Sequence, residues 1–127
     1  MKKILLVEDN QDLQFLLSCR IKSMGFAIIS ANNGMEGVEK AIEEKPDLII
    51  MDILMPGMDG REATRMIRSN PMTKNIPIIV LTVLFRHLDQ ESCIEAGCND
   101  YIVKPFRFKV LQEKIRALIS ASSPNIQ

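Results

Sequence analysis

The chain has 127 residues, and its 16 basic and 16 acidic side chains cancel to a formal net charge of zero. This length is enough for one domain with its own core, so folding needs neither disulfides nor a structural metal. The balanced charge gives no indication of direct binding to nucleic acid or to an anionic membrane.

The cysteines and the apolar segments indicate a compartment. Cys19, Cys93 and Cys98 form no Cys-x-x-Cys pair and have no adjacent histidine, a pattern typical of structural thiols in a reducing compartment. The first apolar run is short and no small-residue cleavage site follows it, so we expect no signal peptide, and no apolar stretch approaches the length of a membrane span. We therefore expect a soluble, cytoplasmic protein.

Short apolar runs predict the strands. They are continuous rather than alternating, which is the pattern of parallel strands covered by helices on both faces. In chain order the runs lie at residues 4–7, 27–31, 48–52, 78–82 and 101–103, of which the second is the weakest.

Helix-length segments with apolar residues at helical spacing separate these runs. We expect Gly25 and Gly97 to end the first and fourth helices, Pro46 to follow the second and Asp59 to cap the start of the third. The predicted helices lie between residues 9 and 25, at 34–44, from 60 to about 69, from about 86 to 96, and from about 108 to 121.

The spacing of apolar residues predicts an apolar face on each of the first two helices. On the second helix, Met35, Val38 and Ile42 share one face. The predicted apolar positions of the first helix are Leu13, Leu16, Leu17, Ile21 and Met24.

Five strand–helix units with right-handed crossovers predict an α/β fold, a doubly wound five-stranded parallel sheet. One domain is expected over residues 1–121, followed at 122–127 by a polar tail or the start of a linker. In sheets of this kind the ligand site lies beyond the carboxyl ends of the strands.

Polar side chains follow four of these strands. Glu8 and Asp9 follow the first, Asp52 ends the third, Thr82 ends the fourth and Lys104 follows the fifth. Taken singly, an acidic residue after a strand is often a helix N-cap, and a threonine there often only satisfies backbone groups. Their convergence at one edge of one sheet is what indicates a functional site.

The chemistry of that edge follows from its charge. At an effective dielectric constant of about 20, two unit charges ~4 Å apart repel by ~4 kcal/mol, so clustered carboxylates need cations. Lys104 supplies one, and all-oxygen ligands without histidine or cysteine favour Mg²⁺ as the other. Thr82 and Lys104 suit the oxygens of a phosphoryl group, and Asp52 is the natural nucleophile, forming an acyl phosphate.

Four segments carry a more specific pattern: VEDN at residues 7–10, PDLIIMDILMPGMDG at 46–60, Leu81-Thr82, and AGCNDYIVKPF at 96–106. In this order they resemble the receiver domain of two-component response regulators, and the resemblance spans residues 3 to about 120. It implies the flavodoxin-like strand order 2-1-3-4-5.

The resemblance implies roles for the site residues. Asp52 would accept a phosphoryl group from a histidine kinase or a phosphotransfer protein. Asp9, Asp52 and the backbone carbonyl of Leu54 would bind Mg²⁺, with Glu8 acting through water. No independent metabolic activity is expected, only Mg²⁺-dependent self-phosphorylation from a phosphodonor and slow autodephosphorylation.

The remaining implied roles concern the phosphoryl group and its readout. Lys104 and the backbone of Val83 would contact the phosphoryl group, and the Lys104-Pro105 bond would be cis. Thr82 and Tyr101 would form a switch that changes the face built from the fourth helix, fifth strand and fifth helix. That face would serve a downstream target or output domain, or a phosphorylation-dependent homodimer.

Three residues depart from the commonest pattern of the family. Val83 replaces a smaller residue, and Leu54 and Leu84 are apolar where many relatives carry a polar side chain. Our hypothesis is that these leucines hinder the attacking water and give a long-lived phosphoryl group.

Three other classes of protein share part of this pattern. A haloacid-dehalogenase-type phosphatase would have a second aspartate two residues after Asp52, where this chain has Leu54. A nucleotide- or flavin-binding domain would have a glycine-rich turn after the first strand, where this chain is acidic. The third is a receiver-like domain that binds partners without being phosphorylated, which the retained charge cluster disfavours.

Overall fold

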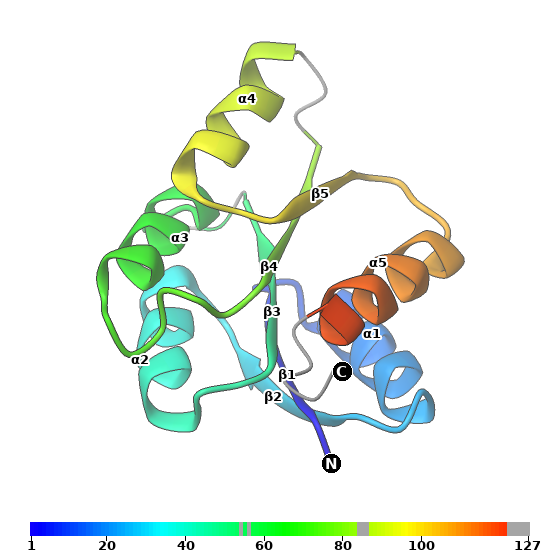
Figure 1. Ribbon diagram of the computed structural model, residues 1–127. Helices are drawn as coiled ribbons and strands as arrows, with labels where there is room; N and C mark the ends of the chain where they lie inside the picture. The colour runs from blue at the N-terminus through cyan, green and yellow to red at the C-terminus, as the bar shows by residue number, and fades with distance from the viewer. Residues whose placement is uncertain (54, 56, 84–86, 122–127) are drawn as a thin grey trace.

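Five parallel strands form one sheet in a computed structural model of the chain, which describes residues 1–53, 55, 57–83 and 87–121 (Figure 1). The strand order is β2-β1-β3-β4-β5. The predicted fold class is confirmed, and so is the order that the resemblance implied. The strands are β1 (Lys3–Val7), β2 (Ala27–Ala31), β3 (Leu48–Asp52), β4 (Ile78–Thr82) and β5 (Asp100–Val103).

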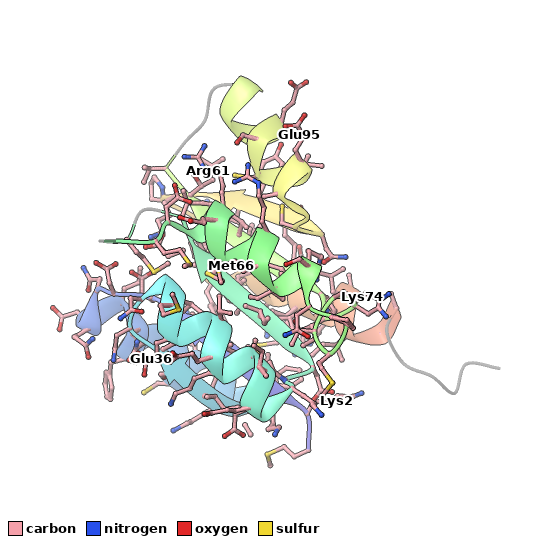
Figure 2. All side chains as sticks on the ribbon, turned by 90° about the vertical axis from the view of Figure 1, so that its left-hand side faces the viewer. Lys2, Glu36, Arg61, Met66, Lys74 and Glu95 are labelled. Atoms are coloured by element: carbon pink, nitrogen blue, oxygen red, sulfur yellow. The ribbon has the colours of Figure 1, made fainter. Side chains whose placement is uncertain are left out.

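Helices cover both faces of this sheet (Figure 1). One face carries α1 (Gln11–Ser23) and α5 (Phe108–Ala121). The other carries α2 (Gly34–Glu44), α3 (Gly60–Ser69) and α4 (His87–Ala96), which Figure 2 shows from outside. The sheet therefore separates two apolar cores, here called the α1–α5 core and the α2–α4 core.

The central strand explains the continuous apolar runs. Successive side chains of a strand point to opposite faces of the sheet, and all five residues of β3 are buried. Leu48 and Ile50 pack in the α1–α5 core, whereas Ile49 and Met51 pack in the α2–α4 core. Because helices cover both faces of the sheet, the side chains that point to either face must be apolar.

Side-chain caps fix the starts of the helices near the carboxyl edge of the sheet. Asn10 Oδ1 accepts a hydrogen bond from the Leu13 amide at 3.0 Å, and Asn33 Oδ1 accepts one from the Glu36 amide at 2.8 Å. Asp59 caps α3, as predicted, by accepting from the amides of Arg61 and Glu62. Gly25 follows α1 with φ +97°, a conformation that favours glycine.

The buried face of α2 differs from the prediction. Val38 is buried, but Met35 is 48% exposed and Ile42 is 37% exposed. Small residues face the sheet instead, and a Cβ at Gly37 would lie 2.8 Å from a methyl carbon of Val7. Because α2 lies so close to β1, only small residues such as glycine and alanine fit between them, and the larger apolar side chains lie on the outer side of the helix.

The apolar face of α1 was also predicted too broadly. Leu17 and Ile21 are buried and Leu13 and Met24 are partly buried, but Leu16 is 50% exposed. Leu16 thus leaves apolar surface on the outside of this helix.

Two of the three cysteines have the character predicted for structural thiols. None of the three forms a disulfide, and Cys93 and Cys98 are buried in the α2–α4 core, whereas Cys19 is exposed. Burial raises the pKa of the Cys98 thiol to about 11, so the reactive thiolate is not populated at neutral pH. Within the described parts of the chain, no helix has both the length and the apolar composition that crossing a membrane requires.

Candidate functional site

Sheet register brings the acidic side chains of two strands together. β1 and β3 are paired with Val7 opposite Met51, so Glu8 and Asp52 follow side by side at the carboxyl edge. Alternation from Leu6 and Ile50 directs both carboxylates toward the α1–α5 side of the sheet. The sequence predicted that Glu8 and Asp52 lie close together because both follow strand ends. The register adds that both side chains lie on the same side of the sheet.

Lys104 lies between these two carboxylates. Its Nζ donates a hydrogen bond to Asp52 Oδ1 at 3.0 Å and stands 3.6 Å from Glu8 Oε1. Both acidic residues are nearly inaccessible, with Glu8 1% and Asp52 4% exposed. One ammonium group thus faces two buried carboxylates, which leaves one negative charge uncompensated within this trio.

Asp9 extends the cluster toward solvent. One carboxylate oxygen from each of Glu8, Asp9 and Asp52 lies within 4.8 Å of the others. Glu8 Oε2 accepts a hydrogen bond from the Asn10 amide at 3.1 Å, which fixes the orientation of its carboxylate. Glu8 Oε1 is buried and accepts no hydrogen bond from any described residue.

This charge cluster perturbs Glu8. Burial is the largest cause and the charge of Asp52 is the next, and together they raise the pKa of Glu8 to about 7. The Asn10 amide and Lys104 act in the opposite direction but are weaker. Glu8 therefore titrates close to neutral pH, where a nearby cation would favour its ionised form.

The donor set fits a magnesium ion. Its ligand atoms are carboxylate oxygens, which hard divalent cations prefer. The buried Glu8 Oε1 has a lone pair free for an ion or its water, and Asp9 is partly exposed, which leaves the cluster accessible from solvent. Leu54, whose carbonyl was expected to complete the set, and Leu84 lie outside the described residues.

The expected switch residues lie on the two neighbouring strands. β3 and β4 pair Asp52 with Leu81, so Thr82 is one residue beyond this pair, and it is 1% exposed. Its carbonyl accepts a hydrogen bond from the Lys104 amide at 2.7 Å. Tyr101 is partly buried against the α2–α4 core, and alternation along β4 assigns Thr82 to the same side of the sheet.

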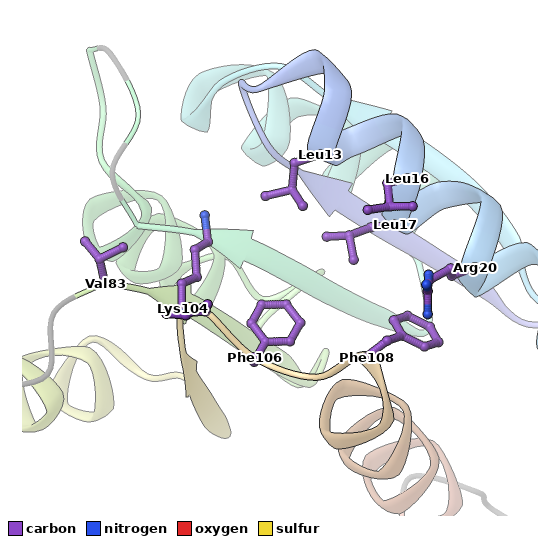
Figure 3. Close-up of a pocket in the computed structure, with 9 residues that line it drawn as sticks. Leu13, Leu16, Leu17, Arg20, Val83, Lys104, Phe106 and Phe108 are labelled. Carbon is purple, nitrogen blue, oxygen red and sulfur yellow. The ribbon is translucent and has the colours of Figure 1, made fainter.

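A groove of about 530 Å³ opens beside Lys104, between α1 and the segment after β5 (Figure 3). The Lys104-Pro105 bond in that segment is cis, as the resemblance implied. Val83 is 43% exposed at the groove, and at the far end the Arg20 guanidinium lies 5.3 Å from the centre of the Phe108 ring. The other lining residues are apolar: Leu13, Leu16, Leu17, Pro105 and Phe106.

Comparison with known proteins decides the family. The family model described as "Response regulator receiver domain" matches residues 4–116 of the chain. The chain belongs to the response-regulator receiver family.

Two curated relatives of this receiver differ in length. It is 34% identical over 121 residues to the alkaline phosphatase synthesis transcriptional regulatory protein PhoP of Bacillus subtilis, covering 95% of this chain and 50% of that protein. It is also 34% identical over 120 residues to protein PilH of Pseudomonas aeruginosa, covering 94% of this chain and 99% of PilH. The receiver thus spans about half the length of the first relative and nearly all of the second.

A solved structure resembles the receiver closely. It is the receiver domain of a sensor histidine kinase from Pseudomonas aeruginosa, with a magnesium ion coordinated in its active-site cleft. The TM-score is 0.87 at 37% identity, and the match covers 94% of this chain and 98% of that one.

Two polar residues that support the site were not predicted from the sequence. Gln14 on α1 donates to the main-chain carbonyl of Glu8 at 2.9 Å, and Asn32 after β2 accepts from Gln14 at 3.1 Å. A polar side chain one turn into a helix, on the side facing a strand end, is the signal that could have identified Gln14. Its partners depend on the tertiary fold.

Proposed function

We propose that this receiver accepts a phosphoryl group on Asp52 in a Mg²⁺-dependent reaction, from a histidine kinase or a phosphotransfer protein. The arrangement of the Asp52 carboxylate carries the proposal: it is buried, 3.0 Å from the Lys104 ammonium group and next to Glu8 Oε1, which accepts no hydrogen bond from any described residue. A purely structural ion pair would not need the two further carboxylates of Glu8 and Asp9 beside it.

The proposed reaction is an in-line transfer between two nucleophiles. An oxygen of Asp52 attacks the phosphorus of a phosphohistidine, the O–P bond forms, and the N–P bond breaks with its electron pair returning to the imidazole. Lys104 stabilises the negative charge on the phosphoryl oxygens. Glu8, Asp9 and Asp52 would hold Mg²⁺, which when bound supplies the additional positive charge that transfer requires.

We propose that Thr82 and Tyr101 transmit phosphorylation to the surface. A phosphoryl group adds about −1.5 to −2 charges, which favours movement of the Thr82 hydroxyl toward it. The partly buried Tyr101 ring lies on the adjacent strand, where a movement of Thr82 would change its packing. The face formed by α4, β5 and α5 would then change its affinity for a target protein, an output domain or a second copy.

The groove beside Lys104 supports a docking site for the phosphodonor protein. It is apolar and leads to Lys104, and Leu16 at its side is 50% exposed. Leu16→Ser should therefore slow phosphotransfer from a cognate kinase more than phosphorylation by acetyl phosphate, which needs no docking surface. Equal effects on the two donors would argue against this docking site.

The central experiment is intact-mass spectrometry after incubation with acetyl phosphate and MgCl₂. The native protein should gain the mass of one phosphoryl group, whereas Asp52→Asn should gain none. EDTA should prevent the gain in the native protein. If a competent kinase also fails to produce the adduct, the receiver acts as an interaction domain without phosphorylation.

We further propose a long phosphoryl lifetime, on the basis of Leu54, Val83 and Leu84. Apolar side chains at these positions would hinder the water that attacks the acyl phosphate. Loss of phosphate from Leu54→Asn and Leu84→Glu should be faster than from the native protein. Unchanged lifetimes in both variants would exclude this role.

We propose the cytoplasm as the location, because three cysteines that form no disulfide suit a reducing compartment. The receiver domain is proposed to comprise residues 1–121, with 122–127 as a tail or the start of a linker. Both a free-standing receiver and one attached to an output domain are consistent with the relatives, because PilH is matched over 99% of its length and PhoP over 50%.

A further inference from the structure

The side-chain amide of Gln14 joins the ends of two strands at the carboxyl edge. Its Nε2 lies 2.9 Å from the carbonyl oxygen of Glu8 and 3.2 Å from that of Ala31. The Ala31 carbonyl also accepts from the Glu8 amide at 3.0 Å. Gln14 therefore bridges Glu8, the residue after β1, and Ala31, the last residue of β2.

The Glu8 carbonyl belongs to the peptide unit that joins Glu8 to Asp9. A peptide unit is planar, so fixing its carbonyl also fixes the direction in which the chain leaves Glu8. Asp9 begins there, and its carboxylate must approach those of Glu8 and Asp52 within the 4.8 Å cluster. A hydrogen bond from Gln14 to this carbonyl thus restrains the placement of the Asp9 carboxylate.

Gln14 is itself held in place. The Oδ1 atom of Asn32 lies 3.1 Å from Gln14 Nε2 and 2.9 Å from Gln11 Nε2. The Asn32 amide donates to Glu36 Oε1 at 2.7 Å, which anchors Asn32 to the first turn of α2. This chain of contacts runs from α2 to the Glu8–Asp9 peptide, and we call these contacts the Gln14 brace.

The Gln14 brace touches no carboxylate of the cluster. Its contacts with β1 and β2 are main-chain carbonyls, whereas the Glu8 carboxylate is held by the Asn10 amide and Lys104. It can therefore influence where the acidic side chains stand without supplying charge to the reaction. Supporting hydrogen bonds of this kind commonly change metal affinity by 10- to 100-fold.

We propose that Gln14 is a positioning residue that sets the Mg²⁺ affinity of the receiver by holding the Glu8–Asp9 peptide, and that it takes no part in phosphoryl transfer itself. This inference rests on the proposed function, because it assigns a role toward the ion that Glu8, Asp9 and Asp52 would hold. The buried Glu8 Oε1, which accepts no hydrogen bond from any described residue, is the independent sign that a ligand belongs there.

Gln14→Met tests the role, because methionine keeps the length and helix propensity of glutamine but removes both N–H donors. The matched control is Gln11→Met, which loses a contact with the same Asn32 oxygen, whereas among the described residues it is Gln14, not Gln11, that bonds the carbonyls of Glu8 and Ala31. MgCl₂ binding is measured by isothermal titration calorimetry, and local order by amide hydrogen exchange at Asp9 and Asn10. The rate of phosphorylation by acetyl phosphate is measured across MgCl₂ concentrations.

Gln14→Met should raise the dissociation constant for Mg²⁺ on the order of 10-fold. It should raise the half-saturating MgCl₂ concentration equally, leave the rate at saturating MgCl₂ unchanged, and speed exchange at Asp9. Gln11→Met should match the native protein. Circular dichroism shows whether Gln14→Met is folded. If it is not, Gln14→Lys, which restores N–H donors, should recover folding and Mg²⁺ affinity.

Three results would overturn the inference. They are an unchanged dissociation constant in Gln14→Met, a lower rate at saturating MgCl₂, and an equal loss of affinity in Gln11→Met. In each case the proposed function would still hold if the native protein binds Mg²⁺ and gains phosphate. A native protein that does neither removes the proposed function, and this inference with it.

Discussion

Lys104 Nζ lies 3.0 Å from Asp52 Oδ1, and the same nitrogen is 3.6 Å from Glu8 Oε1. These two carboxylates end adjacent strands and are almost completely buried. Their mutual repulsion and their shared cation make the stability of the receiver depend on the charges of three side chains. Substitutions at this trio should therefore change both folding and proton binding.

Removal of the shared cation should destabilise the receiver. Lys104→Met leaves two buried carboxylates facing each other, and we expect a loss of about 2 kcal/mol in the free energy of unfolding at pH 8 without divalent cations. Urea unfolding monitored by circular dichroism measures the change. MgCl₂ should recover part of the loss in Lys104→Met, and an exposed control, Lys74→Met, should unfold like the native protein.

Asp52→Asn should lower the pKa of Glu8. The charge of Asp52 is the second cause of the elevation after burial, and its removal also leaves Lys104 to Glu8 alone. Carbon-13 NMR titration of the Glu8 carboxyl group measures the pKa directly. Asp12→Asn removes a charge from an exposed position of α1 and should leave it unchanged. A Glu8 pKa that stays near 7 in Asp52→Asn would show that burial alone accounts for the elevation.

The raised pKa of Glu8 predicts a specific dependence of stability on pH. The pKa of Glu8 is about 7 in the folded protein, against an ordinary value of 4.5, so between these values the folded state binds the additional proton. Without divalent cations, its contribution to stability should be fully present below pH 4.5 and should be lost as pH rises through 7. Urea unfolding at a series of pH values tests this.

Glu8→Gln is the control for that experiment, because it keeps the shape of the side chain and cannot titrate. Relative to Glu8→Gln, the unfolding free energy of the native protein should be constant below pH 4.5, should fall as pH rises toward 7, and should be constant again above that window. If the unfolding free energy of the native protein instead rose with pH relative to that of Glu8→Gln, the predicted direction of the pH dependence would be wrong. Mg²⁺ affinity should rise over the same window, since protons and the ion compete for Glu8.

Much of the fold was predictable from local sequence, for a physical reason. Strands buried on both faces need unbroken apolar runs, so Leu48–Asp52 and Ile78–Thr82 could be delimited without knowing their neighbours. The site residues were predictable because parallel strands end at one edge, which brings Glu8, Asp52 and Lys104 together whatever the details of packing.

Features that depend on close approach were not predictable. The faces of α2 were misassigned because backbone proximity at Gly37, rather than the size of side chains, decides which residues are buried. The Gln14 brace was not predicted, because its partners are main-chain oxygens at the ends of β1 and β2, and main-chain atoms carry no sequence signal. The same applies to Arg68, whose side chain binds carbonyls from two separate loops.

Arg68 should make a large contribution to stability. Its guanidinium donates to the carbonyls of Gly97 at 2.8 Å and Ile76 at 2.7 Å, and to Asn99 Oδ1 at 2.7 Å. These contacts join the end of α3 to the loops before β4 and β5. We expect Arg68→Lys to lose about 2 kcal/mol of unfolding free energy, because a single ammonium group cannot reach all three acceptors.

Urea unfolding and amide exchange at Ile78 check this role, since the Ile78 amide donates to the same Asn99 oxygen at 2.8 Å. Arg65→Lys, at an exposed position of the same helix, is the matched control and should be neutral. Equal stability of Arg68→Lys and Arg65→Lys would mean that charge alone, rather than the geometry of the guanidinium, holds these loops.

The start of α3 packs directly against the strand that carries Asp52. A Cβ built at Gly60 would overlap the Asp52 carbonyl oxygen and stand 2.9 Å from the Ile53 Cα, and both neighbours are backbone atoms that cannot rotate away. Gly60→Ala must therefore displace α3 or the end of β3. We expect a loss of about 3 kcal/mol in unfolding free energy and slower phosphorylation of Asp52 by acetyl phosphate.

Gly57→Ala separates this effect from backbone strain. Gly57 has a φ of +79°, and among the described residues beyond its chain neighbours no atom lies within 4 Å of an added Cβ, so alanine there meets strain without a clash with them. That strain should cost about 1 kcal/mol and leave the rate at Asp52 unchanged. A displaced end of β3 must move the Asp52 carboxylate relative to Lys104. If the two variants lost equal stability and were phosphorylated equally fast, the contact between Gly60 and β3 would therefore not position Asp52.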